Sequence, residues 1–188
     1  KNTLEQEGIG AELFWIGTKP LAGCIACKKC VTLKKCVFND KVNEFLEMAP
    51  GFDGYVFGTP VHWAVAGGAI TSFMDRAFYA GMNSASDVFY LKPAAAVVSA
   101  RRAGTTSTFD QLNKYFTLVQ MPIISSQYWN MVHGACAEEV QQDLEGLQTM
   151  RTLARNMAYF LKCRELAQKS GLPLPKREKQ VLTNFVRS

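Results

Sequence analysis

Residues 54–70, GYVFGTPVHWAVAGGAI, decide the fold. The compact apolar run at residues 55–57 is bounded by turn residues, which predicts a buried strand. From Ile70 to Phe78, apolar residues recur at a spacing of three to four, which predicts a helix. The stretch therefore predicts a strand that turns at residues 58–60 into a helix, which is half of a βαβ unit. In open α/β sheets such turns bind ligands.

Strand and helix patterns alternate along the rest of the chain. The predicted strands are residues 11–16, 55–57, 94–99 and 122–124. The predicted helices are residues 41–48, 68–79, 107–118 and 137–169. Such alternation gives a parallel sheet with helices on both faces. We therefore expect one α/β domain over residues 1–188, a three-layer doubly wound parallel sheet, with a basic tail from about residue 173.

Two further segments have a distinctive composition. Residues 81–90 are small and polar, which suits a lid or an interface loop. Residues 1–8 have the pattern of a helix end, with Gly8 as the C-cap, and no strand comes before them. A sheet does not easily lose a central strand, because its neighbours would keep unpaired backbone groups. We therefore expect that the first βα unit, of about 30 residues, is missing and that the sequence is an N-terminally incomplete part of a longer protein.

Composition argues against several classes of protein. The net charge is +5, and the basic residues form short scattered clusters rather than one continuous face, so nucleic-acid binding is not expected. No apolar run is long enough to cross a bilayer, and the start has no signal-peptide pattern. We expect a cytoplasmic protein without nucleic-acid or membrane partners. The small basic clusters suit an anionic cofactor or an acidic protein partner.

Two turns at predicted strand ends carry candidate binding residues. In the first turn, His62 and Trp63 offer ring faces and polar tips, a suitable rim for a flat heteroaromatic ring such as a flavin. The competing interpretation is packing in the core or an interface. In the second turn, residues 99–106, Arg101 and Arg102 could stabilise a reduced flavin or bind the phosphate of a nicotinamide cofactor. The competing interpretation there is a solvated basic loop. No Ser-His-Asp set or carboxylate pair stands out, so no catalytic side chain is predicted.

Four of the six cysteines lie close together, at a spacing of C-x2-C-x2-C-x5-C. They are Cys24, Cys27, Cys30 and Cys36. In a cytosol-like chain such crowding favours metal or redox chemistry over disulfides. Four thiolates can ligate one [4Fe–4S] cluster, whereas zinc sites usually use two separated pairs. The other alternative is a set of free thiols, made reactive by the neighbouring lysines.

These motifs resemble a known family. Residues 58–79, GTPVHWAVAGGAITSFMDRAFY, resemble the flavin-binding segment of flavodoxin-like NAD(P)H-dependent FMN reductases. Relatives in that family carry a Gly-Ser/Thr-Pro-Val-aromatic turn and a helix that ends near Asp-Arg, which Asp75 and Arg76 match. The cysteine run, followed by Asp40, is similar to the compact motif of iron–sulfur flavoproteins of the same superfamily. The resemblance covers essentially the whole chain in element order.

The resemblance implies a flavodoxin-like sheet, strand order 2-1-3-4-5, with FMN at its switch point. It implies that one wall of the flavin site consists of Thr59, Pro60, Val61, His62, Trp63 and Ala64. The opposite wall would consist of Ser99, Arg101, Arg102, Gly104 and Thr105. It also implies a homodimer or homotetramer in which a partner subunit covers the flavin. The phosphate-binding loop of the family has no counterpart in the sequence.

Three functions remain as hypotheses. The first is an FMN-dependent oxidoreductase in which NAD(P)H reduces the flavin and a quinone, another flavin or another small acceptor takes the electrons. The second is an iron–sulfur flavoprotein, in which a [4Fe–4S] cluster on the cysteine motif receives single electrons from a ferredoxin-like partner. The third is a flavodoxin-fold scaffold without a cofactor.

Overall fold

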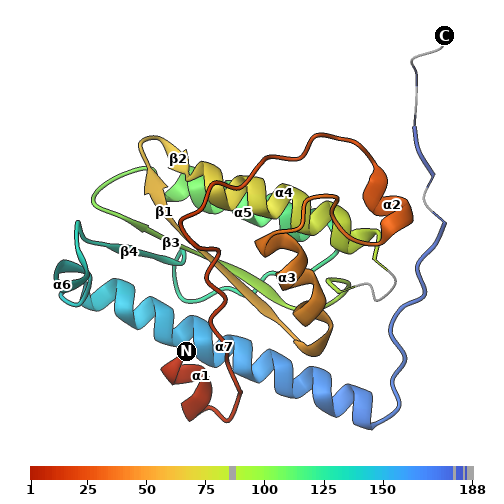
Figure 1. Ribbon diagram of the computed structural model, residues 1–188. Coiled ribbons are helices and arrows are strands. Elements are labelled where there is room, and N and C mark those ends of the chain that lie inside the picture. Colours follow the sequence, from red (N-terminus) through yellow and green to blue (C-terminus); the bar gives the residue numbers. More distant parts are fainter. Residues whose placement is uncertain (85–87, 180, 184, 186–188) are drawn as a thin grey trace.

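The computed structural model describes residues 1–84, 88–179, 181–183 and 185. At its centre is a four-stranded sheet in the order β2-β1-β3-β4 (Figure 1). The strands are β1 (Tyr55–His62), β2 (Val65–Ala66), β3 (Ala94–Ala100) and β4 (Met131–His133). β1, β3 and β4 run parallel, whereas β2 folds back antiparallel from the end of β1. The parallel strands match positions 3-4-5 of the predicted order, and the short antiparallel β2 is a feature that the sequence analysis did not predict.

Helices cover both faces of this sheet (Figure 1). One face is covered by α3 (Lys41–Met48), α4 (Gly68–Met82) and α5 (Thr105–Leu118). The other face is covered by α7 (Leu144–Lys169), against which α1 (Asn2–Gln6) packs. Two short helices, α2 (Lys29–Leu33) and α6 (Ala137–Val140), and a 3-10 turn, η1 (Ala49–Gly51), complete the described elements. The predicted three-layer α/β architecture is confirmed. Within the described residues, no helix is both long and apolar enough to span a membrane.

Aromatic rings build the larger of the two cores. Phe57 of β1 lies between Phe78 of α4 and Phe116 of α5, with ring centroids 5.3 and 5.5 Å away. Phe89 stacks on Phe78 at 4.5 Å. Phe89 and its neighbour Val88 are each 1% exposed, so this end of the predicted lid at residues 81–90 is anchored in the core. Residues 81 and 82 belong to α4, and residues 85–87 of that segment lie outside the described residues.

The prediction of a strand at residues 11–16 is wrong. This segment pairs with none of the strands in the described part of the chain. Its apolar residues serve side-chain packing, since the ring of Phe14 lies 5.6 Å from Phe45 and 6.2 Å from Phe73. On the side away from β3, β1 has described strand partners only at Val61 and His62. The expectation of a further strand beside β1 stays a prediction.

The last strand and the last helix also differ from the prediction. Residues 122–124 form an isolated parallel bridge, Ile123 to Ala94, and parallel pairing resumes at β4. His133 is the last residue of β4. The predicted helix 137–169 is split into α6 and α7, because Asp143 caps α7. Its carboxylate accepts hydrogen bonds from the backbone N–H groups of Gly146 and His133 at 2.9 and 2.7 Å.

Candidate functional site

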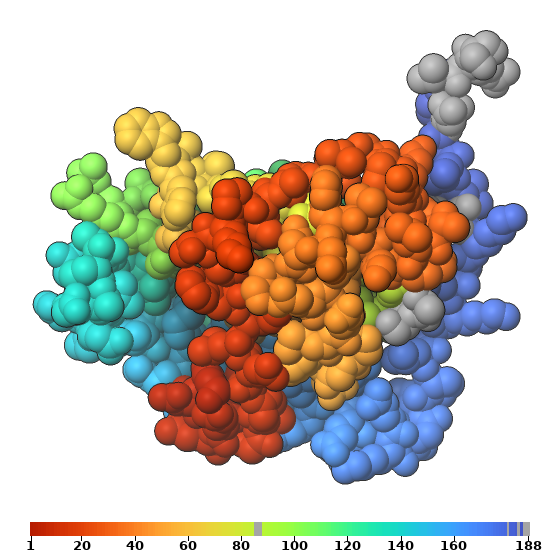
Figure 2. Space-filling model, in the orientation of Figure 1, coloured from red at the N-terminus to blue at the C-terminus, as the bar shows by residue number. Residues whose placement is uncertain are grey.

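The carboxyl ends of the three parallel strands meet along one edge of the sheet. The register places Pro60 of β1 opposite Ser99 of β3, and Ala100 of β3 opposite His133 of β4. Figure 2 shows the segments that follow these strands, coloured yellow, green and teal by residue number, gathered on one side of the molecule. Main-chain pairing of the sheet therefore brings the two predicted turns side by side, which confirms that they adjoin.

The reversal in the first segment lies later than predicted. Residues 58–60 are inside β1, which continues to His62, and the chain reverses at Trp63 and Ala64 before it enters β2. Trp63 has a φ of +58°, in the left-handed region, and the N–H of Ala64 donates to the carbonyl of His62 at 2.7 Å. Pro60 is tolerated inside β1 because the strand has a described partner on only one side at this position.

The predicted residues of this first wall differ in exposure. Trp63 is fully exposed. Pro60, His62 and Ala64 are also exposed, and Val61 is half-buried. Thr59, by contrast, is 7% exposed, and its hydroxyl donates to the carbonyl of Pro60 at 3.0 Å. The aromatic pair of the first turn is therefore accessible to a ligand, whereas the Thr59 hydroxyl is held by the protein.

The second wall touches the first at Gly104. The φ of Gly104 is +88°, and a Cβ added there would lie 2.9 Å from Val61 Cγ1 and 3.2 Å from the carbonyl oxygen of Ala64. Only glycine combines this conformation with so close an approach. Of the other predicted residues of this wall, Arg101 and Arg102 are exposed, Ser99 is half-buried and Thr105 is buried.

Helices α4 and α5 begin beside these two turns. Their N-caps are Gly67 and Gly104, and neither position provides a side-chain hydrogen bond to the described helix start. The first N–H groups of a helix have no partner within the helix, and they carry partial positive charge. Electron-rich ring nitrogens and oxygens are therefore favoured at this edge. Together with the exposed aromatic pair and the two arginines, this edge fits the isoalloxazine part of FMN.

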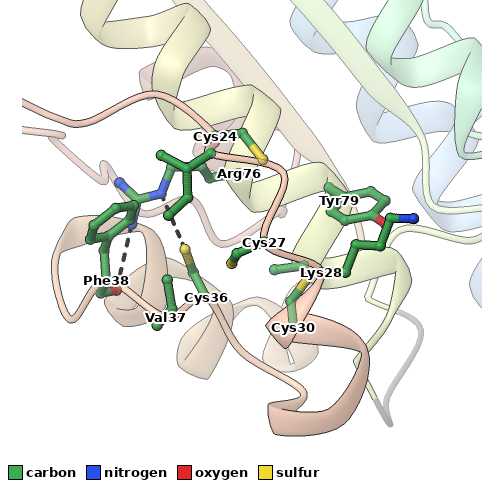
Figure 3. A pocket seen from close by; sticks show the side chains of 11 residues that line it. Cys24, Cys27, Lys28, Cys30, Cys36, Val37, Phe38, Arg76 and Tyr79 are labelled. Atoms are coloured by element: carbon green, nitrogen blue, oxygen red, sulfur yellow. Dashed lines mark hydrogen bonds between the residues drawn. The ribbon is translucent and has the colours of Figure 1, made fainter.

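The four-cysteine segment lies near the opposite end of α4 from the β1–β2 turn (Figure 1). The side chains of Cys24, Cys27, Cys30 and Cys36 line a single pocket (Figure 3). Its cavity of about 20 Å³ has room for roughly one water molecule. Burial raises the pKa of the Cys30 thiol, and the other three cysteines raise it further. Within the described residues, no group of three or more histidine, cysteine, aspartate or glutamate side chains is arranged to hold a metal ion.

The backbone of this segment is unusual. Ala26, Lys28 and Lys34 have φ values of 52°, 56° and 60°, in the left-handed region that non-glycine residues rarely adopt. Such conformations cost about 1–3 kcal/mol each, and they persist only where the surroundings determine them. They are typical of ligand sites. The segment therefore needs an anchor, and the structure provides one in α4.

That anchor is Arg76, which the sequence analysis noted only as part of a family motif. Its side chain is 1% exposed and makes a bidentate ion pair with Asp40, with both N–O distances 2.8 Å. Its Nε donates to the sulfur of Cys36 at 3.2 Å. Burial lowers the pKa of Arg76, but the hydrogen bonds to Asp40 and Cys36 outweigh this and raise it. A signal was present in the sequence, because Arg76 follows Phe73 by three residues on the apolar face of α4, where a cation needs a partner.

Comparison with known proteins identifies the family. The sequence model that describes the NADPH-dependent FMN reductases matches residues 1–135. The chain belongs to this family. An iron–sulfur flavoprotein of Methanocaldococcus jannaschii is 27% identical to this FMN reductase family member over 168 residues, which cover 86% of each chain. The crystal structure of RosB with bound 8-demethyl-8-formylriboflavin-5′-phosphate has a similar fold. Its TM-score is 0.63 at 13% identity, over 100% of this chain and 84% of RosB.

Membership of the FMN reductase family confirms the resemblance and the flavodoxin-like fold predicted from the sequence. The protein is a flavin-dependent oxidoreductase, and FMN and NADPH are the cofactors that the family supports. This argues against the scaffold hypothesis. The individual contacts of the eleven flavin-site residues, the role of the cysteines and the oligomeric state stay predictions.

Proposed function

We propose that this protein is an FMN-dependent NAD(P)H oxidoreductase whose flavin ring binds at the two strand-end turns. The observation that carries the proposal is the contact between these turns at Gly104, which makes them one continuous edge. When bound, FMN would supply the hydride and electron transfer between NAD(P)H and a quinone, another flavin or another small acceptor. The residues of the chain bind and orient the ring.

The side chains of the two walls have different roles. Trp63 and His62 cover a ring face and exclude water from it. Arg101 and Arg102 favour the negative charge that the flavin ring carries after reduction. Pro60, Val61 and Ala64 shape the first wall, with Thr59 beneath them, and Ser99, Gly104 and Thr105 shape the second. None of these residues needs to transfer a proton.

The flavin site is open on the outside, where Trp63 is fully exposed. We infer that a second subunit covers it, in a homodimer or homotetramer. Size-exclusion chromatography with light scattering checks this inference, and a monomer with fully bound FMN would contradict it.

The test of the proposal is an anaerobic titration of the purified protein. FMN is added first, and binding is followed by the visible spectrum and by flavin fluorescence. NADH and NADPH are then added separately, and bleaching of the flavin absorption is recorded. We expect FMN to bind and at least one nucleotide to reduce it. Replacing Arg101 and Arg102 together by Gln should weaken FMN binding or slow its reduction. A protein that takes up no FMN, or bound FMN that neither nucleotide reduces, overturns the proposal.

A second function is favoured by the pocket that all four cysteines line and by the similarity to an iron–sulfur flavoprotein. Cys24, Cys27, Cys30 and Cys36 have the donor chemistry for a [4Fe–4S] cluster. The exposed Lys28, Lys29, Lys34 and Lys35 would attract an acidic ferredoxin-like partner. Protein purified without oxygen should then contain iron and sulfide, and its broad absorption should disappear in Cys27→Ala. Flavin bands without iron would leave the reductase as the function.

A further inference from the structure

We propose that Arg76 is the positioning residue of the four-cysteine segment: its guanidinium ties both ends of the segment to α4 and holds the Cys36 sulfur at the shared pocket. The sequence pattern of the cysteines does not require such a residue. The proposal comes from the contacts that one buried cation makes. It concerns the arrangement of the thiols, and it therefore applies whether or not they hold a cluster.

The guanidinium has five N–H donors, and all five are used. Nη1 and Nη2 bind the two carboxylate oxygens of Asp40. Nη1 also donates to the carbonyl of Ala22 at 3.2 Å, and Nη2 to the carbonyl of Phe38 at 3.5 Å. Nε donates to Cys36 Sγ, as the dashed line in Figure 3 shows.

These contacts close the segment into a loop. Ala22 precedes the first cysteine of the motif, whereas Phe38 and Asp40 follow the last one. Arg76 therefore joins the two ends of the motif at a single point on α4. The Phe38 ring packs over the guanidinium in a cation–π contact, with its centroid 4.8 Å from the guanidinium carbon.

The backbone of Cys36 is fixed independently of Arg76. The buried side chain of Asn43 accepts from the Cys36 N–H and donates to the Cys36 carbonyl, both at 2.9 Å. The main chain at Cys36 is thus held by α3 and its sulfur by α4. Loss of Arg76 should free the sulfur and the Ala22 end of the loop while the Cys36 backbone stays in place.

A planar five-donor cation is needed at this position. The bidentate pair with Asp40 and the separate Nε–H toward sulfur require the fork of a guanidinium. Lysine offers one ammonium group, which cannot reach the carboxylate, two carbonyls and the sulfur at once. The Arg76→Lys variant should therefore keep the positive charge and lose the set of hydrogen bonds that positions the segment. This variant separates the effect of positioning from the effect of charge.

Arg76 would also affect a bound cluster, and this part rests on the proposed iron–sulfur function. Hydrogen bonds to the coordinating sulfurs and nearby positive charge make the reduction of an iron–sulfur centre more favourable. A cluster held by Cys36 should therefore have a more negative midpoint potential when the Nε–H donor is removed. The potential of FMN, bound at the far end of α4, should not change.

The test uses Co²⁺ as a probe of thiol arrangement in the full-length, reduced protein without iron. Sulfur-to-cobalt charge-transfer absorption reports how many thiolates converge, and its titration gives the affinity. We expect measurable binding by the wild type and a loss of about tenfold or more in Arg76→Gln, the range for residues that orient metal ligands. Lys35→Gln removes an exposed charge from the same segment and should bind Co²⁺ within about twofold of the wild type.

Arg76→Lys keeps the experiment decisive if Arg76→Gln fails to fold, as judged by circular dichroism. It should lose affinity as Arg76→Gln does. Wild-type affinity and spectrum in Arg76→Lys would overturn the proposal, and so would a wild type whose thiols do not bind Co²⁺ together. An Arg76-dependent Co²⁺ site in a protein that assembles no cluster would leave the positioning role standing and remove the iron–sulfur function. A cluster whose stability and potential in both Arg76 variants equal those of the wild type would support the iron–sulfur function and remove the positioning role of Arg76.

Discussion

The strand-end turns and the cysteine segment occupy opposite ends of α4, and they are held in place in different ways. The turns owe their position to the main chain, because the register of β1 and β3 sets Pro60 against Ser99. The cysteine segment owes its position to a side chain, because Arg76 joins its two ends. A site held by the sheet should tolerate most substitutions of its side chains. A site held by one buried cation should depend on that cation.

The largest expected effect is on Arg76. Arg76→Gln should lower the free energy of unfolding by roughly 3 kcal/mol, at the low end for a broken buried ion pair, because the Asp40 side chain is 29% exposed. Urea unfolding followed by circular dichroism measures this. The control is Lys41→Gln, which breaks an exposed ion pair with Glu44 and should cost about 1 kcal/mol or less. Equal losses in the two variants would remove the contrast between the regions.

The next effect is at Gly104, where the two turns touch. Gly104→Ala should cost about 1–3 kcal/mol, since alanine would be strained at a φ of +88° and would approach Val61 Cγ1 too closely. It should also weaken FMN binding in the same titration. Gly10→Ala is the matched control, because a Cβ there meets nothing within 4 Å. If Gly104→Ala is as stable as the control, the two turns do not touch as described.

A smaller effect is expected at Asp143, which ties the end of β4 to the start of α7. Asp143→Ala should cost about 1 kcal/mol as a lost helix cap. Burial raises the pKa of Asp143, but the N–H groups of Gly146 and His133 outweigh this and lower it. The ionised carboxylate therefore stabilises the fold above its unfolded pKa of about 4, and this is lost as pH falls through the lower folded value. Urea unfolding at pH 7 and pH 3 should show the wild type and variant converging in acid. A constant difference would contradict this.

The smallest effect on stability is expected for Trp63. Because its ring is fully exposed, Trp63→Ala should change the free energy of unfolding by no more than about 0.5 kcal/mol. FMN affinity should nevertheless fall, because the ring covers the flavin in the proposed site. Leu13→Ala, also at an exposed position, is the control and should change neither quantity. A Trp63→Ala variant with normal stability and normal FMN binding would remove Trp63 from the site.

The strand-end turns were largely predictable from the sequence because their signals are local. The apolar run at residues 55–57 and the helical spacing after Ile70 predict β1 and α4, and parallel pairing then brings the strand ends together. The point of reversal was predicted too early, since Gly58 and Pro60 usually interrupt a strand. They do not do so here, where β1 has a described strand partner on only one side. The apolar residues at 11–16 led to the wrong prediction of a strand. Packing of an extended segment against α3 and α4 selects the same alternate apolar residues as a strand does.

The cysteine segment was predictable only in part. The spacing of the four cysteines indicates a shared site. In the structure Asp40 caps the helix of residues 41–48, since its carboxylate accepts from the N–H of Val42. The same carboxylate also binds Arg76, which lies far along the sequence. A single sequence contains no local pattern for such a pair, because it arises only when α4 packs beside the segment. The anchor of the segment therefore became visible only in the structure.

The exposure of Trp63 has a consequence for spectroscopy. The two other tryptophans, Trp15 and Trp129, are also largely exposed, at 72% and 51%. Their emission should thus resemble that of tryptophan in water even in the folded protein, and unfolding should shift it little. A flavin beside Trp63 should instead quench the emission strongly by energy transfer. Intrinsic tryptophan fluorescence of this protein should therefore report flavin binding well and unfolding poorly.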